Sequence, residues 1–163
     1  MVGLRPIDQA LFDAVAAQAR SSPRQRCNHN FHAESEPVQR FLNVLQPGTY
    51  VRPHRHQRAT AGAGFECFVV LQGAIGLLLL DADGAVIHQE RLEAQGPLRG
   101  IELAEGQFHT LVALTADAVM FELKQGPYVP TADKDFLACF PLEGSPEASA
   151  QELAWRRRFQ ADG

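Results

Sequence analysis

The chain has 163 residues, of which 45% are hydrophobic, so it is long enough for one well-buried domain and too short for two ordinary ones. Its 19 acidic and 15 basic residues leave a net charge of -4, which gives no electrostatic reason to expect a nucleic-acid partner. The N-terminus lacks the apolar stretch of a signal peptide, and no run of about 20 apolar residues exists to span a membrane. Cys27, Cys67 and Cys139 are odd in number and form no CxxC pair, which argues against a disulfide framework. We therefore expect a soluble, cytoplasmic protein.

The first element that the sequence predicts is a short amphipathic helix. Leu11, Val15 and Ala19 recur at four-residue spacing after Asp8, and the pattern ends before Ser21-Ser22-Pro23. We expect residues 1–25 to form a helical segment that packs on the outside of the core.

Between residues 38 and 128 the pattern changes to short segments rich in Val, Leu, Ile and Phe, separated by Gly and Pro. This spacing is typical of an all-β sandwich or barrel. Asp81-Ala-Asp-Gly84 predicts a tight hairpin turn in which Gly84 supplies a positive φ, and residues 115–118 predict a second turn. The expected strands are residues 39–45, 49–54, 66–72, 74–80, 86–92, 100–103, 109–113 and 119–125.

The barrel is followed by an extension over residues 129–163. Its last part, from Ser145 to Phe159, suits a helix, because Ser145 can cap it, Pro146 suits the first helical position and Glu147 lies in the first turn. No internal repeat or linker is visible, so we expect one domain over residues 1–163.

Three histidines and one glutamate form the strongest functional pattern. Residues two apart on a strand share a face, so His54 and His56 would present two imidazoles to one ion, and Glu66 would place a carboxylate at the rim of an apolar interior. A lone carboxylate there is costly to bury unless it is paired or bound to metal. His109, after Gly106, would complete the set. Imidazole and carboxylate suit zinc, iron, manganese, nickel or copper, so we expect one divalent transition metal ion per chain of undecided identity.

The spacing of these residues resembles the two cupin motifs. The first, Gly-x5-His-x-His-x(3 or 4)-Glu-x6-Gly, is matched by Gly48, the His pair, Glu66 and Gly73, with a longer gap of nine residues between the second His and the Glu. The second, Gly-x5-Pro-x-Gly-x2-His-x3-Asn, is met at its second Gly and its His, with Ala104 and Ala113 in place of the Pro and the Asn. The resemblance implies a cupin double-stranded β-helix, which is a jelly-roll barrel.

A narrower resemblance runs nearly from end to end of the chain, through residues 26–32, 37–40, 47–57, 108–110, 126–128, 130 and 134–136. In these segments the chain resembles the WbuC family of cupin-fold metalloproteins, which occur in bacteria and are associated with O-antigen and other surface-polysaccharide gene clusters. Cys139-Phe140-Pro141 departs from the family, in which a Trp-containing Ala-Pro segment is usual. The resemblance implies a bound metal and a link to carbohydrate metabolism, and cupin barrels often form homodimers.

Further side chains are candidates for chemistry beside the metal. Tyr50 and Arg52 have the same parity as His54, so on a regular strand they would face inward, Tyr50 as an acid or hydrogen-bond donor and Arg52 as a clamp for a carboxylate or phosphate. Asn28 and His32 could bind a ligand or donate to Glu66 from a polar segment ahead of the barrel, or they could belong to a loop that merely closes it.

The strands at either side of the barrel core add three more candidates. Arg40 is a possible ligand contact, and Tyr128 either contacts a ligand or simply covers the barrel. An inward Glu122 would need a raised pKa or a partner, for which an ion pair with Arg40 or Arg52 is the ordinary explanation and a catalytic base the alternative.

These patterns predict a metal-dependent enzyme that acts on a small carbohydrate-derived substrate, for example by isomerisation or epimerisation. Two alternatives stay open. One is a non-catalytic saccharide-binding protein whose metal fixes the barrel or anchors a ligand, and the other is an iron-dependent dioxygenase, since the same ligands can leave positions for O₂ and substrate.

Overall fold

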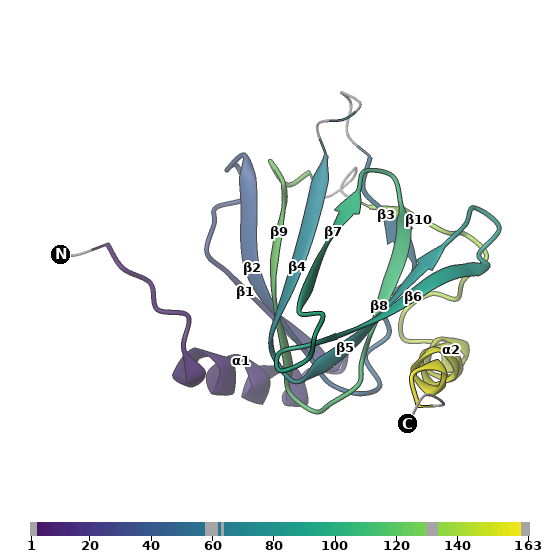
Figure 1. Ribbon diagram of the computed structural model, residues 1–163, viewed down its shortest axis with the longest axis horizontal. Helices are drawn as coiled ribbons and strands as arrows, with labels where there is room; N and C mark the ends of the chain where they lie inside the picture. The colour runs from purple at the N-terminus through teal and green to yellow at the C-terminus, as the bar shows by residue number, and fades with distance from the viewer. Residues whose placement is uncertain (1–2, 58–61, 63, 130–133, 161–163) are drawn as a thin grey trace.

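The computed structural model describes residues 3–57, 62, 64–129 and 134–160, and within them the strands form two five-stranded antiparallel sheets that face each other (Figure 1). The all-β barrel expected from the sequence is confirmed. The first sheet has the order β1 (Arg26–Asn30), β2 (Val38–Leu45), β9 (Ala118–Gln125), β4 (Phe65–Gln72) and β7 (Gly100–Ala104). The second has the order β10 (Asp135–Phe136), β3 (His54–Arg55), β8 (Phe108–Ala113), β5 (Ala74–Leu80) and β6 (Val86–Glu93).

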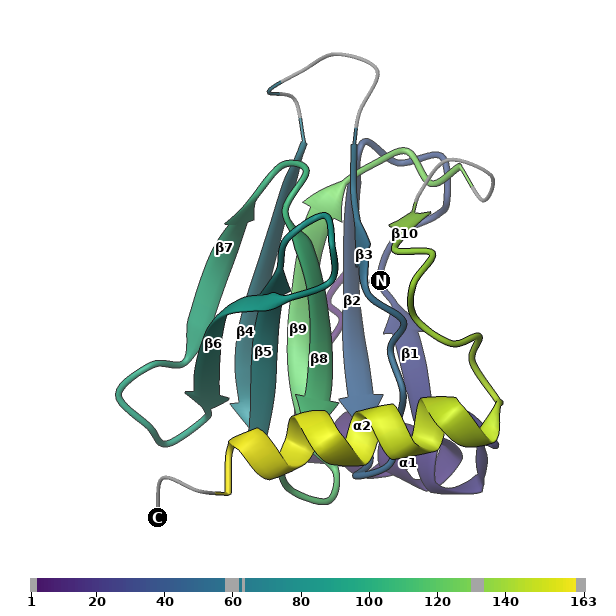
Figure 2. The same cartoon turned by 90° about the vertical axis from the view of Figure 1, so that its right-hand side faces the viewer.

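Both expected helices are present, and each begins at a side-chain cap. Asp8 accepts the N–H of Leu11 at the start of α1 (Gln9–Ser21), and Ser145 accepts the N–H of Ala148 at the start of α2 (Pro146–Arg158). The two helices lie at one end of the barrel, away from the end at which β4 begins and β9 ends (Figure 2). In the described part of the chain, no helix combines the length and the apolar character that crossing a membrane requires.

The strands alternate as the sequence predicts, so one face of each sheet fills the barrel. On β4 the side chains of Glu66, Phe68 and Val70 are buried, whereas Val69 between them is 37% exposed. The buried faces of β4, β5, β8 and β9 meet in an apolar cluster nearest the helices, and this cluster positions the polar ends of the same strands.

The expected hairpin turn at Asp81 is confirmed. The Asp81 carboxylate accepts the N–H groups of Asp83 and Ala85, and Gly84 has a φ of +88°. A tighter constraint acts at Gly73 between β4 and β5, where φ is +69° and a Cβ atom would lie 2.2 Å from Thr115 Oγ1. Glycine is therefore required at this motif position by the backbone conformation and by the close approach of Thr115.

Two expectations about strands are wrong. Residues 49–53 do not form a strand, because regular pairing begins only at His54, where β3 is two residues long. Conversely, residues 26–30, which were expected to be a polar segment ahead of the barrel, form β1 and pair with β2 from Arg26–Leu45 to Asn30–Phe41. A five-residue edge strand without hydrophobic alternation gives no strand signal of its own, since its structure depends on the partner strand.

Candidate metal centre and its cavity

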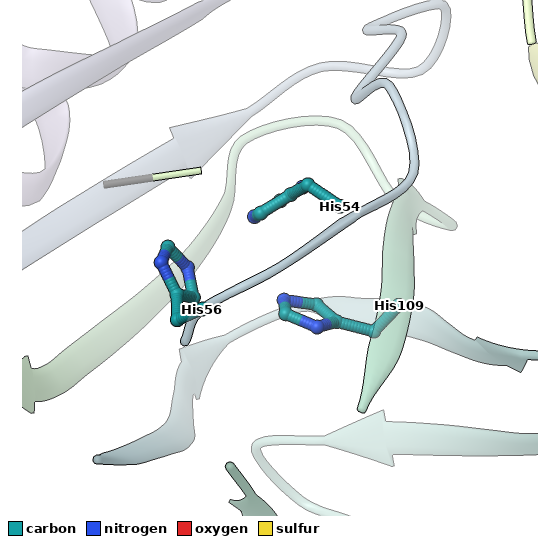
Figure 3. A group of neighbouring side chains, drawn as sticks. All are labelled: His54, His56 and His109. Atoms are coloured by element: carbon teal, nitrogen blue, oxygen red, sulfur yellow. The ribbon is translucent and has the colours of Figure 1, made fainter. Parts of the chain in front are cut away.

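His54, His56 and His109 gather at one point inside the barrel, as Figure 3 shows. His54 lies on β3 directly opposite His109 on β8, and His56 follows two residues after His54. The three side chains are 3 to 8% exposed. Their ligand nitrogens all lie within 4.8 Å of one another. Three imidazole nitrogens grouped this closely could be ligands of one ion, which histidine nitrogens bind at about 2.0–2.1 Å.

The main chain fixes which nitrogen of two rings faces this point. His54 Nδ1 lies 2.9 Å from the carbonyl oxygen of Arg52, and His109 Nδ1 lies 3.0 Å from that of Gln107. A carbonyl oxygen only accepts, so Nδ1 carries the proton and Nε2 is left with its lone pair. Burial holds the pKa of His54 and of His109 below the ordinary value, which keeps both rings in the neutral form that metals bind.

Glu66 brings a carboxylate to the same point from β4. Its oxygens lie 3.3 Å from His56 Nε2 and 3.2 Å from His109 Nε2, and the residue is 5% exposed. Burial favours the neutral acid, but the neighbouring imidazoles and a hydrogen bond from Glu122 outweigh it and hold the pKa of Glu66 well below its usual value. Three imidazoles and an ionised carboxylate form a donor set that fits a divalent transition metal.

Glu122 lies next to Glu66, and its pKa is shifted in the opposite direction. Burial, followed by the charge of Glu66, raises the pKa of Glu122 well above its usual value, so Glu122 keeps its proton to a higher pH than Glu66 does. Asn43 donates a hydrogen bond to Glu122 Oε2. The expected ion pair of Glu122 with Arg40 or Arg52 is wrong, because Arg40 pairs with Glu36 and Arg52 Nη2 donates to the carbonyl oxygen of Leu137.

The four residues stand at the wall of a cavity of about 740 Å³, with His54, Glu66 and His109 lining it directly. One wall of the cavity is formed by β1 and β2, whose lining residues include Asn28, Asn30, Gln39, Phe41 and Asn43. The sequence-predicted candidates Asn28, His32, Glu122 and Tyr128 all line this cavity. Side-chain amides dominate the wall, and they both donate and accept hydrogen bonds.

Three sequence-predicted candidates lie outside the cavity. The hydroxyl group of Tyr50 donates to the carbonyl oxygen of Pro141, its ring stacks on Trp155 of α2, and burial raises its pKa to about 12. The guanidinium of Arg52 lies over the ring of Phe136, and Arg40 faces Glu36. The expectation that Tyr50 and Arg52 share the inward face of His54 is wrong, because the irregular backbone before β3 breaks the alternation and turns Val51 toward the cavity instead.

Several cavity residues did not emerge as candidates from the sequence. Asn30 and Asn43 alternate correctly on their strands, but the same alternation occurs on any half-buried strand. Lys134 reaches the cavity from the residue before β10, and only the pairing of β10 with β3 brings it there. The one sequence feature that could have indicated Lys134 is the rarity of lysine, because the sequence has only two lysines. Both of them, Lys124 and Lys134, line the cavity.

Comparison with solved structures shows that the chain has the cupin fold. It is similar to the capsular polysaccharide assembling protein CapF from Staphylococcus aureus, with a TM-score of 0.55 and 18% identity over 68% of this chain. It is also similar to an oxalate oxidase solved in complex with glycolate, with a TM-score of 0.55 and 14% identity over 88% of this chain and 76% of that one. A conserved Streptococcus pyogenes protein of unknown function, SPY1581, has a TM-score of 0.52 and 13% identity over 79% of this chain and 93% of that one.

The chain spans only 29% of the length of CapF, and at these identities the similarities establish the fold alone. No curated protein sequence matches the chain. A family model does match it over residues 7–92, which is more than half of its 163 residues and includes His54, His56 and Glu66. The chain therefore belongs to the family described as a domain of unknown function, DUF6016.

Proposed function

We propose that this protein is a metal-dependent enzyme that acts on a small carbohydrate-derived substrate. The observation that carries the proposal is the convergence of three imidazoles and a carboxylate at the wall of a cavity of about 740 Å³. A cavity of this size is in the range of small-molecule sites. His54, His56, Glu66 and His109 would hold one divalent transition metal ion, which when bound supplies a Lewis acid that polarises a carbonyl or hydroxyl oxygen.

The protein's own groups could position the substrate and move a proton. The amide side chains of Asn28, Asn30 and Gln39 offer the paired donors and acceptors that hydroxyl groups of a sugar require. Glu122 lines the cavity beside Glu66, and its raised pKa suits its carboxyl group to donate a proton to a substrate oxygen and take it back. Isomerisation and epimerisation need only such proton transfers.

Finer assignments belong to the same proposal. Membership of the WbuC family would link the protein to bacterial surface-polysaccharide metabolism, and the fold shared with a capsular polysaccharide assembling protein supports that direction. We also propose a single cupin domain, a cytoplasmic location and a homodimer, the last because cupin barrels commonly pair through their sheets.

Metal content of tag-free protein, measured by elemental mass spectrometry, tests the site. We expect near-stoichiometric metal in the wild type, loss of that metal in His109→Ala, and retention in the matched control His88→Ala, since His88 is exposed on β6 and pairs with Glu90. Metal at 100 times its Kd should also stabilise the wild type by about 2.7 kcal/mol over the chelated protein, and His109→Ala should lose this gain. Equal metal in all three proteins, or none after reloading, would reject the site.

Catalysis is tested separately from metal binding. Metal-replete protein is incubated for a prolonged period with a panel of sugars, sugar acids and sugar phosphates, and products are followed by NMR. We expect a product in the wild type and its absence in His109→Ala. Saturable binding of a sugar without any product would instead support the non-catalytic saccharide-binding alternative. Oxygen uptake by the iron-loaded protein would support the dioxygenase.

A further inference from the structure

Both lysines of the chain line the cavity, although the sequence has 13 arginines and a net charge of -4. Lysine carries a compact, mobile ammonium group that serves as a point charge for anions, whereas arginine is the usual choice for structural ion pairs. Arg24 and Arg26, which also line the cavity, follow that rule because both pair with Glu143. The placement of both lysines in one cavity therefore points to a ligand rather than to surface solvation.

The first lysine belongs to a row of three side chains that crosses the sheet. Lys124 on β9 lies directly opposite Gln39 on β2 and opposite Glu66 on β4. Directly opposed residues have Cβ atoms about 4.5–5.5 Å apart, so the row leads from a proposed metal ligand through an ammonium group to an amide. All three residues are buried, with exposed fractions of 3 to 5%.

Gln39 supplies the second observation that points to a ligand. Its Nε2 atom is buried, and no side chain or main-chain group in the described residues accepts a hydrogen bond from it. A buried amide donor without an acceptor is costly and rare in native proteins. Because Gln39 lines the cavity beside Lys124, a ligand oxygen that accepts from Lys124 lies within reach of this donor as well.

Lys134 brings the second ammonium group from the opposite sheet. It precedes β10, which pairs with β3 at Phe136 and His54, so its position is tied to that of the first histidine. Lys124 and Lys134 thus bring two ammonium groups to one cavity from two different sheets. Two cationic groups placed in this way can bind one anionic group between them.

We propose that Lys124, Lys134 and Gln39 Nε2 bind the anionic group, a carboxylate or a phosphate, of a polyhydroxylated substrate whose next oxygens face the three histidines. The inference rests on the proposed function and deepens it, because it names the substrate class as a sugar acid or a sugar phosphate. The shared chemistry is an anionic oxygen that accepts from two ammonium groups and one amide.

The test is isothermal titration of metal-loaded protein with three matched probes: D-glucose, D-glucuronate and D-glucose 6-phosphate. We expect one of the two anions to bind about 10- to 100-fold more tightly than glucose, the range that a charged hydrogen bond provides. The better anion identifies the carboxylate or the phosphate as the group that is recognised. Protection of the lysine amines from reductive methylation, read peptide by peptide by mass spectrometry, gives an independent measure of occupancy.

Three variants locate the anion. Lys124→Met and Lys134→Met should each reduce the preference for the anion by about tenfold. Arg91→Met is the matched control, since it removes one positive charge from β6 outside the cavity wall, where Arg91 pairs with Glu93, and should leave the preference unchanged. Lys134→Met keeps the test usable if Lys124→Met fails to fold, because Lys134 is exposed at the cavity wall and Lys124 is buried.

Each result has one meaning for the anion site. Equal binding of all three probes, an anion preference that survives both lysine substitutions, or neither binding nor lysine protection by any probe would overturn it. Metal content of the same samples separates this failure from failure of the proposed function. Bound metal without an anion preference rejects the anion site alone, whereas wild-type protein that cannot be loaded rejects the metal centre on which it rests.

Discussion

The two halves of the barrel interior differ in chemistry although the same strands build both. On β4 the inward side chains run from Glu66 to Phe68 and Val70, and on β9 they run from Lys124 at the site to Met120 in the core. The half nearest the helices is apolar and fully buried, and the other half holds the histidines, the carboxyl groups and the lysines. A strand pairing that buries the apolar half thus also sets the positions of the polar half, four to six residues away along each strand.

This arrangement predicts that the two halves contribute differently to folding stability and to ligand binding. Apolar burial contributes about 25 cal/mol for each Å² removed from water, whereas buried polar groups contribute little net stability and are costly when they lack a partner. The apolar half should therefore dominate the free energy of unfolding, and the polar half should dominate ligand and metal binding.

The largest effect is expected from a cavity in the apolar half. Leu77→Ala should lower the free energy of unfolding by about 2–5 kcal/mol, because Leu77 on β5 is fully buried in the apolar cluster. Ile87→Ala, a matched change at a side chain that is 58% exposed on β6, should cost less than about 0.5 kcal/mol. Denaturant unfolding measures both. Metal content per folded chain should stay at the wild-type level in Leu77→Ala, and its loss would show that the halves are not separable.

A smaller effect is expected from the raised pKa of Glu122. The unfolded state loses the Glu122 proton near pH 4.5, whereas the folded state keeps it up to a higher pH, because the pKa of Glu122 is raised. The contribution of Glu122 to the stability of metal-free protein therefore falls as pH rises above 4.5, by at most about 1.4 kcal/mol per pH unit, until Glu122 ionises in the folded state. The lowered pKa values of His54 and His109 make stability rise with pH up to about 6.5, so the Glu122 contribution is measured as a difference between wild type and a variant that cannot ionise at this position. The lowered pKa of Glu66 acts in the opposite direction, so its contribution is lost as pH falls below 4.5.

Replacing Glu122 by Gln should remove this contribution, so that the stability of the variant relative to wild type rises with pH above 4.5, since the amide cannot ionise and can still donate to Glu66. Unfolding of chelated protein at a series of pH values between 4.5 and 8 measures the difference. Glu102→Gln on β7, where the side chain is exposed, is the control and should follow the wild type. Parallel profiles for wild type and Glu122→Gln would mean that Glu122 is ionised in the folded protein at every pH tested.

The sequence predicted most of this arrangement because its signals are local. The apolar alternation located seven of the eight expected strands to within one residue at each end, and the spacing of His54, His56 and Glu66 located the candidate metal centre. The C-terminal helix was marked by its capping residue Ser145, and the N-terminal helix by the four-residue spacing of Leu11, Val15 and Ala19. Each of these features depends on residues that are close in the chain.

The features that the sequence did not predict depend on pairings between distant residues. β1 and β10 are strands only because they pair with β2 and β3, respectively. Their own residues show no alternation of hydrophobic and polar side chains. The inward face before β3 was assigned wrongly to Tyr50, because a regular strand was assumed for a segment whose conformation is set by contacts with α2 and Pro141. Lys134 reaches the cavity because β10, which follows it, pairs with β3. No local sequence pattern predicts this pairing.

The smallest effect should have the opposite sign and would sharpen the contrast between the halves. Gln39→Leu replaces a buried amide whose Nε2 has no acceptor in the described part of the chain, so it should raise the free energy of unfolding of the ligand-free protein by about 1 kcal/mol. Asn43→Leu, on the same face of β2, should lower it by about 1–3 kcal/mol, because Asn43 donates to Glu122 and its loss leaves that buried carboxyl group short of a partner.

Denaturant unfolding of the two variants compares two amides that lie four residues apart on one strand. Asn43 donates to Glu122, whereas Gln39 Nε2 has no acceptor in the described part of the chain. A gain for Gln39→Leu together with weaker binding of the preferred anion would mean that the polar half keeps Gln39 for a ligand at the expense of stability. Destabilisation of similar size in both variants would mean that Gln39 already has its hydrogen-bond partner in the folded protein, and that the two amides serve the same structural purpose.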